Sequence, residues 1–112
     1  MNILVLAGGY SPERDVSLAS GCLIANALMK NGWNVAMADV FEDADPDAEF
    51  LSPGSREYAY TIPETEPDLE ALRRKRPGNA LIGRGVLELA ARADVVFLAL
   101  HGGMGENGQI QA

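Results

Sequence analysis

A short apolar segment followed at once by two glycines constrains the fold of this chain more than any other feature. Asn2 to Ala7 is almost wholly apolar and rich in branched side chains, which is typical of a strand buried on both faces of a sheet. Gly8 and Gly9 then allow the backbone to turn sharply and to approach a ligand closely. Ser11 and Pro12 follow in the order of a helix N-cap and a first helical residue. This sequence of elements predicts one edge of a ligand site.

Two further segments extend this start into an α/β sheet. Apolar residues at three- and four-residue spacing predict a helix from about Asp15 to Met29, and Asn34 to Val40 is predicted as a second strand. A right-handed β-α-β connection makes these strands parallel. Asp94 to Leu100 is predicted as another strand that is apolar on both faces. We expect a three-layer α/β fold of the Rossmann or flavodoxin type, with a parallel sheet in strand order 2-1-3.

The chain between the second and third strands is less regular. Residues 41–67 are predicted to form an acidic insertion that varies within the protein's family, with an exposed strand or hairpin arm at Glu57–Ile62. A loop of this length is either functional or mobile, and we favour a solvated insertion over a functional loop. A short helix is predicted over Pro67–Lys75 and another helix over Asn79–Ala93, although Gly83 and Gly85 weaken the first turns of the second.

Charge and composition exclude several classes of function. The 112 residues carry a net charge of −7, and residues 42–70 alone hold ten acids against one base, which leaves +2 for the remainder. A nucleic-acid-binding domain would instead present a basic face. The N-terminal apolar run is too short for a signal peptide or a membrane span, so we expect a cytoplasmic protein with no membrane partner. The single cysteine, Cys22, is interpreted as a small buried apolar residue.

Two loops are predicted to meet at one edge of the sheet. With strand order 2-1-3, the crevice lies between the first and third strands, where the order reverses. The Gly8–Ser17 loop and the His101–Gly108 loop would face each other there, so that Glu13 and His101 line one pocket. A carboxylate and an imidazole can hold the ammonium and carboxylate groups of a small zwitterion, or act as base and acid.

Each of these residues also has an interpretation without a ligand site. Glu13 can be a helix N-terminal charge without function, and His101 can be a hydrogen-bonded residue at a strand end. Gly103–Gly108 has the form G-x-G-x-x-G, but it follows the third strand rather than the first, so we do not favour a nicotinamide or flavin site. The sequence has no P-loop and no His, Cys and carboxylate cluster with metal-ligand spacing, so no metal site is predicted.

The two loops resemble the N-terminal signatures of D-alanine–D-alanine ligases. Gly8–Gly21 is similar to G-G-x-S-x-E-R-[ED]-V-S-L-x-S-G, and His101–Gln111 is similar to H-G-x-x-G-E-[DN]-G-x-[IL]-Q. The resemblance covers the whole chain, residues 1–112, as the family's single N-terminal, substrate-binding domain, which precedes the ATP-grasp domains. A final predicted helix opens at Gln109 and reaches only Ala112, so we expect a longer protein.

The resemblance implies an ATP-dependent ligase that joins two D-alanines for peptidoglycan synthesis. It implies that Glu13 helps to hold the first substrate's ammonium group, that Val16 lines that pocket and that His101 lies by the substrate carboxylate. Gly102 is expected to bind substrate as well, and Gly8, Gly9 and Ser11 to form the loop.

Several expectations concern the longer enzyme. ATP and Mg²⁺ (or Mn²⁺) would bind mainly to domains outside these residues, so that this domain alone holds no cofactor and has no ligase activity. The enzyme is expected to be a homodimer. Two alternatives stay open: a ligase that makes D-alanyl-D-lactate or D-alanyl-D-serine, and a non-catalytic module of the same fold that binds a small ligand.

Overall fold

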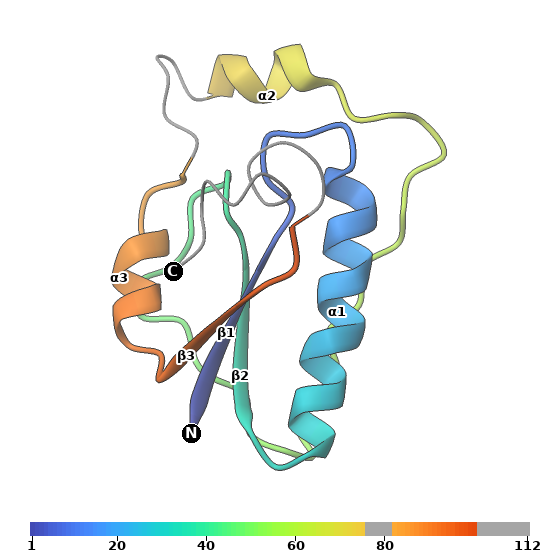
Figure 1. The fold of residues 1–112 in the computed structure, drawn as a ribbon. Coiled ribbons are helices and arrows are strands. Elements are labelled where there is room, and N and C mark those ends of the chain that lie inside the picture. The colour runs from blue at the N-terminus through green and yellow to red at the C-terminus, as the bar shows by residue number, and fades with distance from the viewer. Residues whose placement is uncertain (76–81, 101–112) are drawn as a thin grey trace.

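The computed structural model describes residues 1–75 and 82–100, which form a three-stranded parallel sheet with helices on both faces (Figure 1). The strand order is β2-β1-β3, and Ile3 lies opposite both Val35 and Val95. The predicted fold class and strand order are therefore confirmed. The strands and helices are β1 (Asn2–Ala7), α1 (Arg14–Lys30), β2 (Asn34–Asp39), α2 (Leu69–Lys75), α3 (Val86–Ala91) and β3 (Val95–Leu98).

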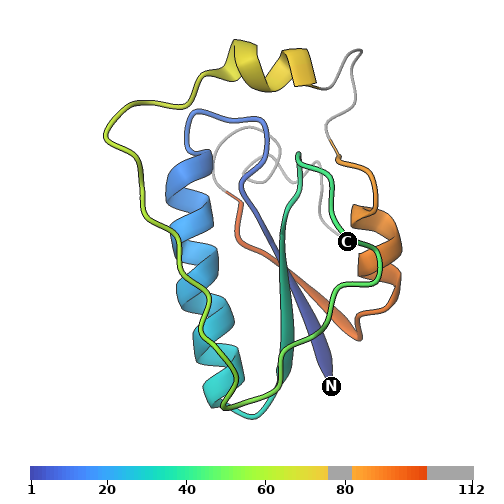
Figure 2. The ribbon, with the colours of Figure 1, turned by 180° about the vertical axis from the view of Figure 1, so that it is seen from behind.

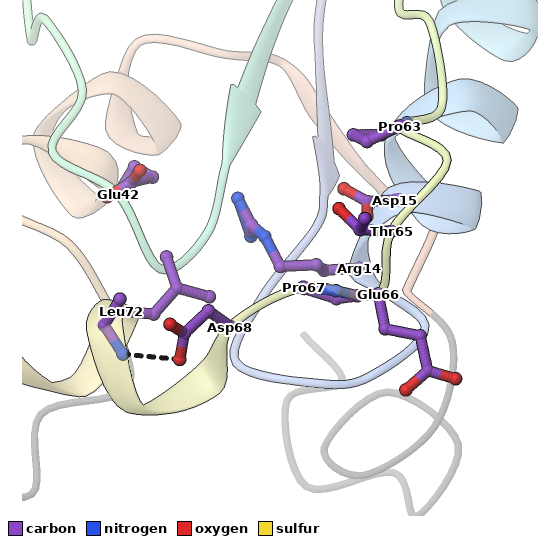
Figure 3. Close-up of a pocket in the computed structure, with 10 residues that line it drawn as sticks. Arg14, Asp15, Glu42, Pro63, Thr65, Glu66, Pro67, Asp68 and Leu72 are labelled. Carbon is purple, nitrogen blue, oxygen red and sulfur yellow. Dashed lines mark hydrogen bonds between the residues drawn. The ribbon is translucent and has the colours of Figure 1, made fainter.

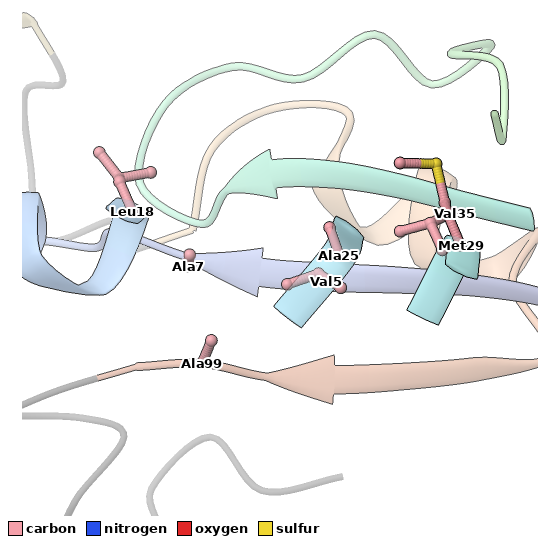
Figure 4. Close-up of a cluster of buried hydrophobic side chains, with 7 residues drawn as sticks. All are labelled: Val5, Ala7, Leu18, Ala25, Met29, Val35 and Ala99. Atoms are coloured by element: carbon pink, nitrogen blue, oxygen red, sulfur yellow. The ribbon is translucent and has the colours of Figure 1, made fainter. Parts of the chain in front are cut away.

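One face of the sheet is covered by α1. This helix packs on β1 and β2, and the side chains between them form a buried cluster (Figure 4). Val5, Ala25 and Val35 in this cluster are completely buried. The apolar residues of α1 that recur at three- and four-residue spacing in the sequence are therefore the ones that pack against the sheet. The cluster comprises Val5, Ala7, Leu18, Ala25, Met29, Val35 and Ala99.

The opposite face is covered by α3. Leu4 from β1 is completely buried there, and Val86 and Leu89 from α3 are each 1% exposed. Figures 1 and 2 show α1 and α3 on opposite sides of the strands. The third layer of the predicted architecture is thus formed by a helix of only six residues.

The helix predicted from about Asp15 to Met29 is confirmed, since α1 spans Arg14–Lys30, but Ser11 is not its N-cap. The N-cap is Glu13, and the Arg14 N–H donates to the Ser11 carbonyl at 3.1 Å, so a tight turn precedes the helix. In α3, helical structure begins at Val86, not at Asn79, because Gly85 has φ 82° and the Gly83 N–H donates to the Val40 carbonyl. Residues 79–81 lie outside the described residues.

The predicted burial of the third strand on both faces is also wrong. Val95 and Phe97 have exposed fractions of 43% and 42%, whereas Val96 and Leu98 pack into the cluster beneath α3. The reason is geometric: α1 lies over β1 and β2, and β3 is the last strand of the described sheet. An apolar run alone does not distinguish a central strand from an edge strand.

The acidic segment between β2 and α2 runs along α1 (Figure 2) rather than forming the strand predicted at residues 57–62. The side-chain amide of Asn26 donates to the Tyr58 carbonyl and accepts the Tyr58 N–H, both at 2.8 Å. These two backbone groups are therefore paired by a side chain instead of by a neighbouring strand. The Tyr58 hydroxyl donates to the Val35 carbonyl at 2.8 Å. That residues 41–67 vary within the family stays a prediction.

Candidate functional site

The glycine turn lies at the carboxyl end of β1, where the sequence places it. Gly8 and Gly9 have φ values of 76° and 91°, a backbone conformation that residues other than glycine rarely adopt. A Cβ atom on Gly8 would lie 2.6 Å from the carboxyl carbon of Asp39. Backbone conformation and close packing therefore both require glycine at position 8.

A buried ion pair holds this turn in place. The Arg14 guanidinium pairs with the Asp39 carboxylate, and both side chains are almost completely buried. Arg14 Nη1 donates to the Gly9 carbonyl at 3.1 Å, while Asp39 Oδ1 accepts the N–H groups of Gly9 and Phe41, each at 3.0 Å. Because each charged group also bonds to the backbone, the pair fixes the shape of the loop.

Neither Arg14 nor Asp39 was predicted as a site residue, although a signal for each was present. Arg14 stands next to Glu13 in the loop signature, and Asp39 ends a strand parallel to β1. Since parallel strands end at one edge of a sheet, an acid at the end of β2 and a base in the β1 loop are brought together.

Glu13 occupies the N-cap position of α1, and its side chain is exposed. The Ser11 hydroxyl donates to Glu13 Oε2 and accepts the Glu13 N–H, both at 3.1 Å. Val16, one turn further along, is 48% exposed. The glutamate is thus held by its own loop at a helix N-terminus, where a carboxylate is favoured, and remains accessible to a ligand.

The end of β3 lies beside this loop. The Ala99 N–H donates to the Leu6 carbonyl at 2.8 Å, and a Cβ atom on Gly9 would lie 3.9 Å from Leu100 Cδ2. His101 and Gly102 fall outside the described residues, so the proximity of Glu13 and His101 stays a prediction. The described chain brings the residues just before His101 to the glycine turn.

These observations agree with comparisons with known proteins. Residues 2–112 match the family described as the D-ala D-ala ligase N-terminus. The chain belongs to this family. It is 44% identical to a D-alanine–D-alanine ligase of Pediococcus pentosaceus and 39% identical to one of Lacticaseibacillus casei, in each case over 100% of the chain. A D-alanine–D-alanine ligase of Lawsonia intracellularis is 32% identical over the same extent.

The chain spans only part of these family members. It covers 34% of the Pediococcus protein, 33% of the Lacticaseibacillus protein and 24% of the Lawsonia protein. The matched region is the N-terminal domain of the ligases, in agreement with the resemblance of the two loops.

A separate pocket of about 400 Å³ lies between the start of α1, the segment at residues 63–68 and α2 (Figure 3). Arg14 and Asp15 line it from α1, and Glu42 and Leu72 lie across from them. Glu13 does not line this pocket. The Tyr60 hydroxyl donates to Asp15 Oδ1 at 2.5 Å, and this bond is the main cause that raises the pKa of Tyr60 to about 12.

The described residues, 1–75 and 82–100, show neither a metal-ligand group nor a membrane-spanning helix. Within these ranges, no three His, Cys, Asp or Glu side chains are grouped so as to hold a metal ion. None of the helices in the same ranges combines the length and apolar character that crossing a membrane requires.

Proposed function

We propose that this chain is the N-terminal domain of an ATP-dependent D-alanine–D-alanine ligase and contributes the site for the first D-alanine. The observation that carries this proposal is the family match over residues 2–112, which includes both loop signatures. The strand order β2-β1-β3 supports it, because the two loops follow the neighbouring strands β1 and β3. In the longer protein, the joined product would serve peptidoglycan synthesis.

The chemistry of a small zwitterion explains the two proposed contacts. Glu13 offers an exposed carboxylate to the ammonium group of D-alanine. His101 lies by the substrate carboxylate, which ATP phosphorylates before the amine of the second substrate attacks. Val16 and Gly102 form walls of the same small site. Opposite charges at the two ends select an amino acid over an amine or a simple acid.

ATP and Mg²⁺ (or Mn²⁺) are proposed to bind to the longer protein, mainly at domains outside this chain. We further propose that the ligase is a cytoplasmic homodimer and that D-alanine, rather than D-lactate or D-serine, is its second substrate.

The test uses the longer protein with Glu13→Gln, which keeps the shape of the side chain and removes its charge. Loss of a charged hydrogen bond is expected to raise the KM for the first D-alanine roughly 10- to 100-fold, with the KM for ATP unchanged. D-Alanine-dependent formation of ADP measures both constants. Glu88→Gln is the matched control, because Glu88 is an exposed residue on α3 and should leave both constants at wild-type values.

His101→Ala tests the other contact by the same assay. The KM for the first D-alanine should again rise while the KM for ATP stays constant, since the imidazole is assigned to the amino acid. If both variants showed wild-type D-alanine kinetics, the proposed substrate site would be contradicted. If the longer protein formed no ADP in the presence of D-alanine, the proposed function would be contradicted.

A further inference from the structure

The ends of β1 and β3 are joined by one buried hydroxyl group. Ser17 belongs to α1 and is completely buried. Its Oγ accepts the Gly8 N–H at 2.8 Å and donates to the carbonyl oxygen of Ala99. A single side-chain oxygen therefore links the loop after β1, the end of β3 and the first turns of α1.

This arrangement differs from the usual behaviour of a serine within a helix, whose hydroxyl bonds to its own helical backbone or to water. The Ser17 N–H makes the ordinary helical bond to the Glu13 carbonyl at 3.0 Å, so only the hydroxyl leaves the helix. A hydroxyl has one donor and can accept as well, and Ser17 uses both functions on backbone groups that directly follow two different strands.

Those two backbone groups lie where the strands separate. The Ala99 N–H still bonds to the Leu6 carbonyl, but beyond this point the Gly8 N–H and the Ala99 carbonyl bond to Ser17 instead of to each other's strand. The separation of neighbouring strands at a reversal of strand order forms the crevice of such folds. Ser17 thus bridges the two chain segments at the point where the hydrogen bonds between β1 and β3 end.

We propose that Ser17 is a positioning residue for the first D-alanine site. It fixes the loop that leads from Gly8 to Glu13 against the end of β3, so that the Glu13 carboxylate is held in place for the substrate ammonium group. The inference rests on the proposed function of the site and adds to it a residue that touches no substrate.

The experiment measures D-alanine kinetics of the longer protein with Ser17→Ala. Removal of the hydroxyl leaves a buried N–H and a buried carbonyl without their partner, so the loops shift apart. A displaced Glu13 loses part of its charged hydrogen bond to the substrate ammonium group, which weakens binding of the first D-alanine. We expect a KM for the first D-alanine that is raised roughly tenfold, with an unchanged KM for ATP.

Two further variants distinguish the proposed positioning role of Ser17 from a purely structural role. Ala25→Gly lowers the stability of the same helix at a completely buried position remote from the loops, and it should lower Tm without a change in D-alanine KM. The double variant Ser17→Ala with Glu13→Gln should be no worse than Glu13→Gln alone, because residues that act as one unit are not additive. Additive losses would overturn the proposal.

Should Ser17→Ala fail to fold, Ser17→Cys keeps a side chain of similar shape with a weaker donor and is expected to raise the D-alanine KM by a smaller factor. A folded Ser17→Ala or Ser17→Cys protein with wild-type D-alanine kinetics overturns the positioning role while the proposed function stands. A wild-type protein without D-alanine-dependent ADP formation overturns both.

Discussion

Tyr60 and Cys22 illustrate how surroundings set the chemistry of single residues. The Tyr60 hydroxyl reaches from the acidic segment to the Asp15 carboxylate, and a tyrosinate there would face that negative charge. Burial raises the pKa of the Cys22 thiol, and its sulfur lies 3.8 Å from the sulfur of Met37. Cys22 is therefore the inert, buried residue that its place in an apolar stripe predicts.

The Tyr60 hydrogen bond gives stability a defined pH dependence. The folded-state pKa of about 12 lies above the ordinary value of 10.0, so the bond stabilises fully below pH 10 and is lost as the pH rises toward 12. Wild-type protein should thus exceed Tyr60→Phe in Tm at neutral pH, and the difference should vanish between these two pH values. Thermal unfolding of both proteins across this range measures it, and a pH-independent difference would contradict the assignment.

At the scale of elements, α1 approaches the sheet closely because of Gly21. A Cβ atom at this position would lie 2.9 Å from the Ala7 Cβ and 2.8 Å from the Met37 Cε. The methionine can move, but Ala7 is fixed within β1. The close helix–strand contact that a mid-helix glycine indicates is therefore present.

Gly21→Ala should destabilise the protein although alanine is the better helix former. Overpacking costs about 1–3 kcal/mol, and the gain in helix propensity is about 1 kcal/mol, so we expect a net loss of about 1 kcal/mol. Urea unfolding measures the change. Ala27→Gly, at an exposed position of the same helix, reports the propensity contribution alone. A Gly21→Ala protein as stable as wild type would show that the contact relaxes freely.

Helices and strands could be predicted from the sequence where a periodic pattern of apolar residues determines them. The apolar runs at residues 2–7 and 34–39, with the stripe of α1 between them, define the parallel pair β1 and β2. Gly83 and Gly85 indicated a weak start for α3, but the residue at which it begins depends on contacts of Gly83 with Val40 and Glu42, which are distant in the chain. The bond between Arg14 and Asp39 also joins distant segments, and only the rule that parallel strands end at one edge of a sheet indicates it.

At the scale of the whole molecule, the layer formed by α3 is held against the sheet by a small buried interface. The short helix α3 attaches to the sheet through Val86 and Leu89, both 1% exposed, while its neighbour Leu87 is 66% exposed. Strand order followed from general rules of α/β topology, whereas the exposure of β3 depended on how far α1 extends across the sheet.

Leu89→Ala and Leu87→Ala form a matched pair that tests the second layer. Truncation of Leu89 leaves a cavity beneath α3 and should lower the free energy of unfolding by about 2–5 kcal/mol. The same change at Leu87 should stay within about 0.5 kcal/mol of wild type. Chemical denaturation distinguishes the two, and equal effects would mean that α3 does not cover the sheet as described.

The central place of β1 has a consequence for synthesis on the ribosome. The first strand to emerge bonds to β2 on one side and to β3, some ninety residues later in the chain, on the other. Until Val95–Leu98 is translated, one row of amide and carbonyl groups on β1 stays open to pairing with other nascent chains. A chain that stalls within the acidic segment therefore keeps this edge of β1 unpaired, and a chaperone that shields an unpaired strand edge would act during that interval.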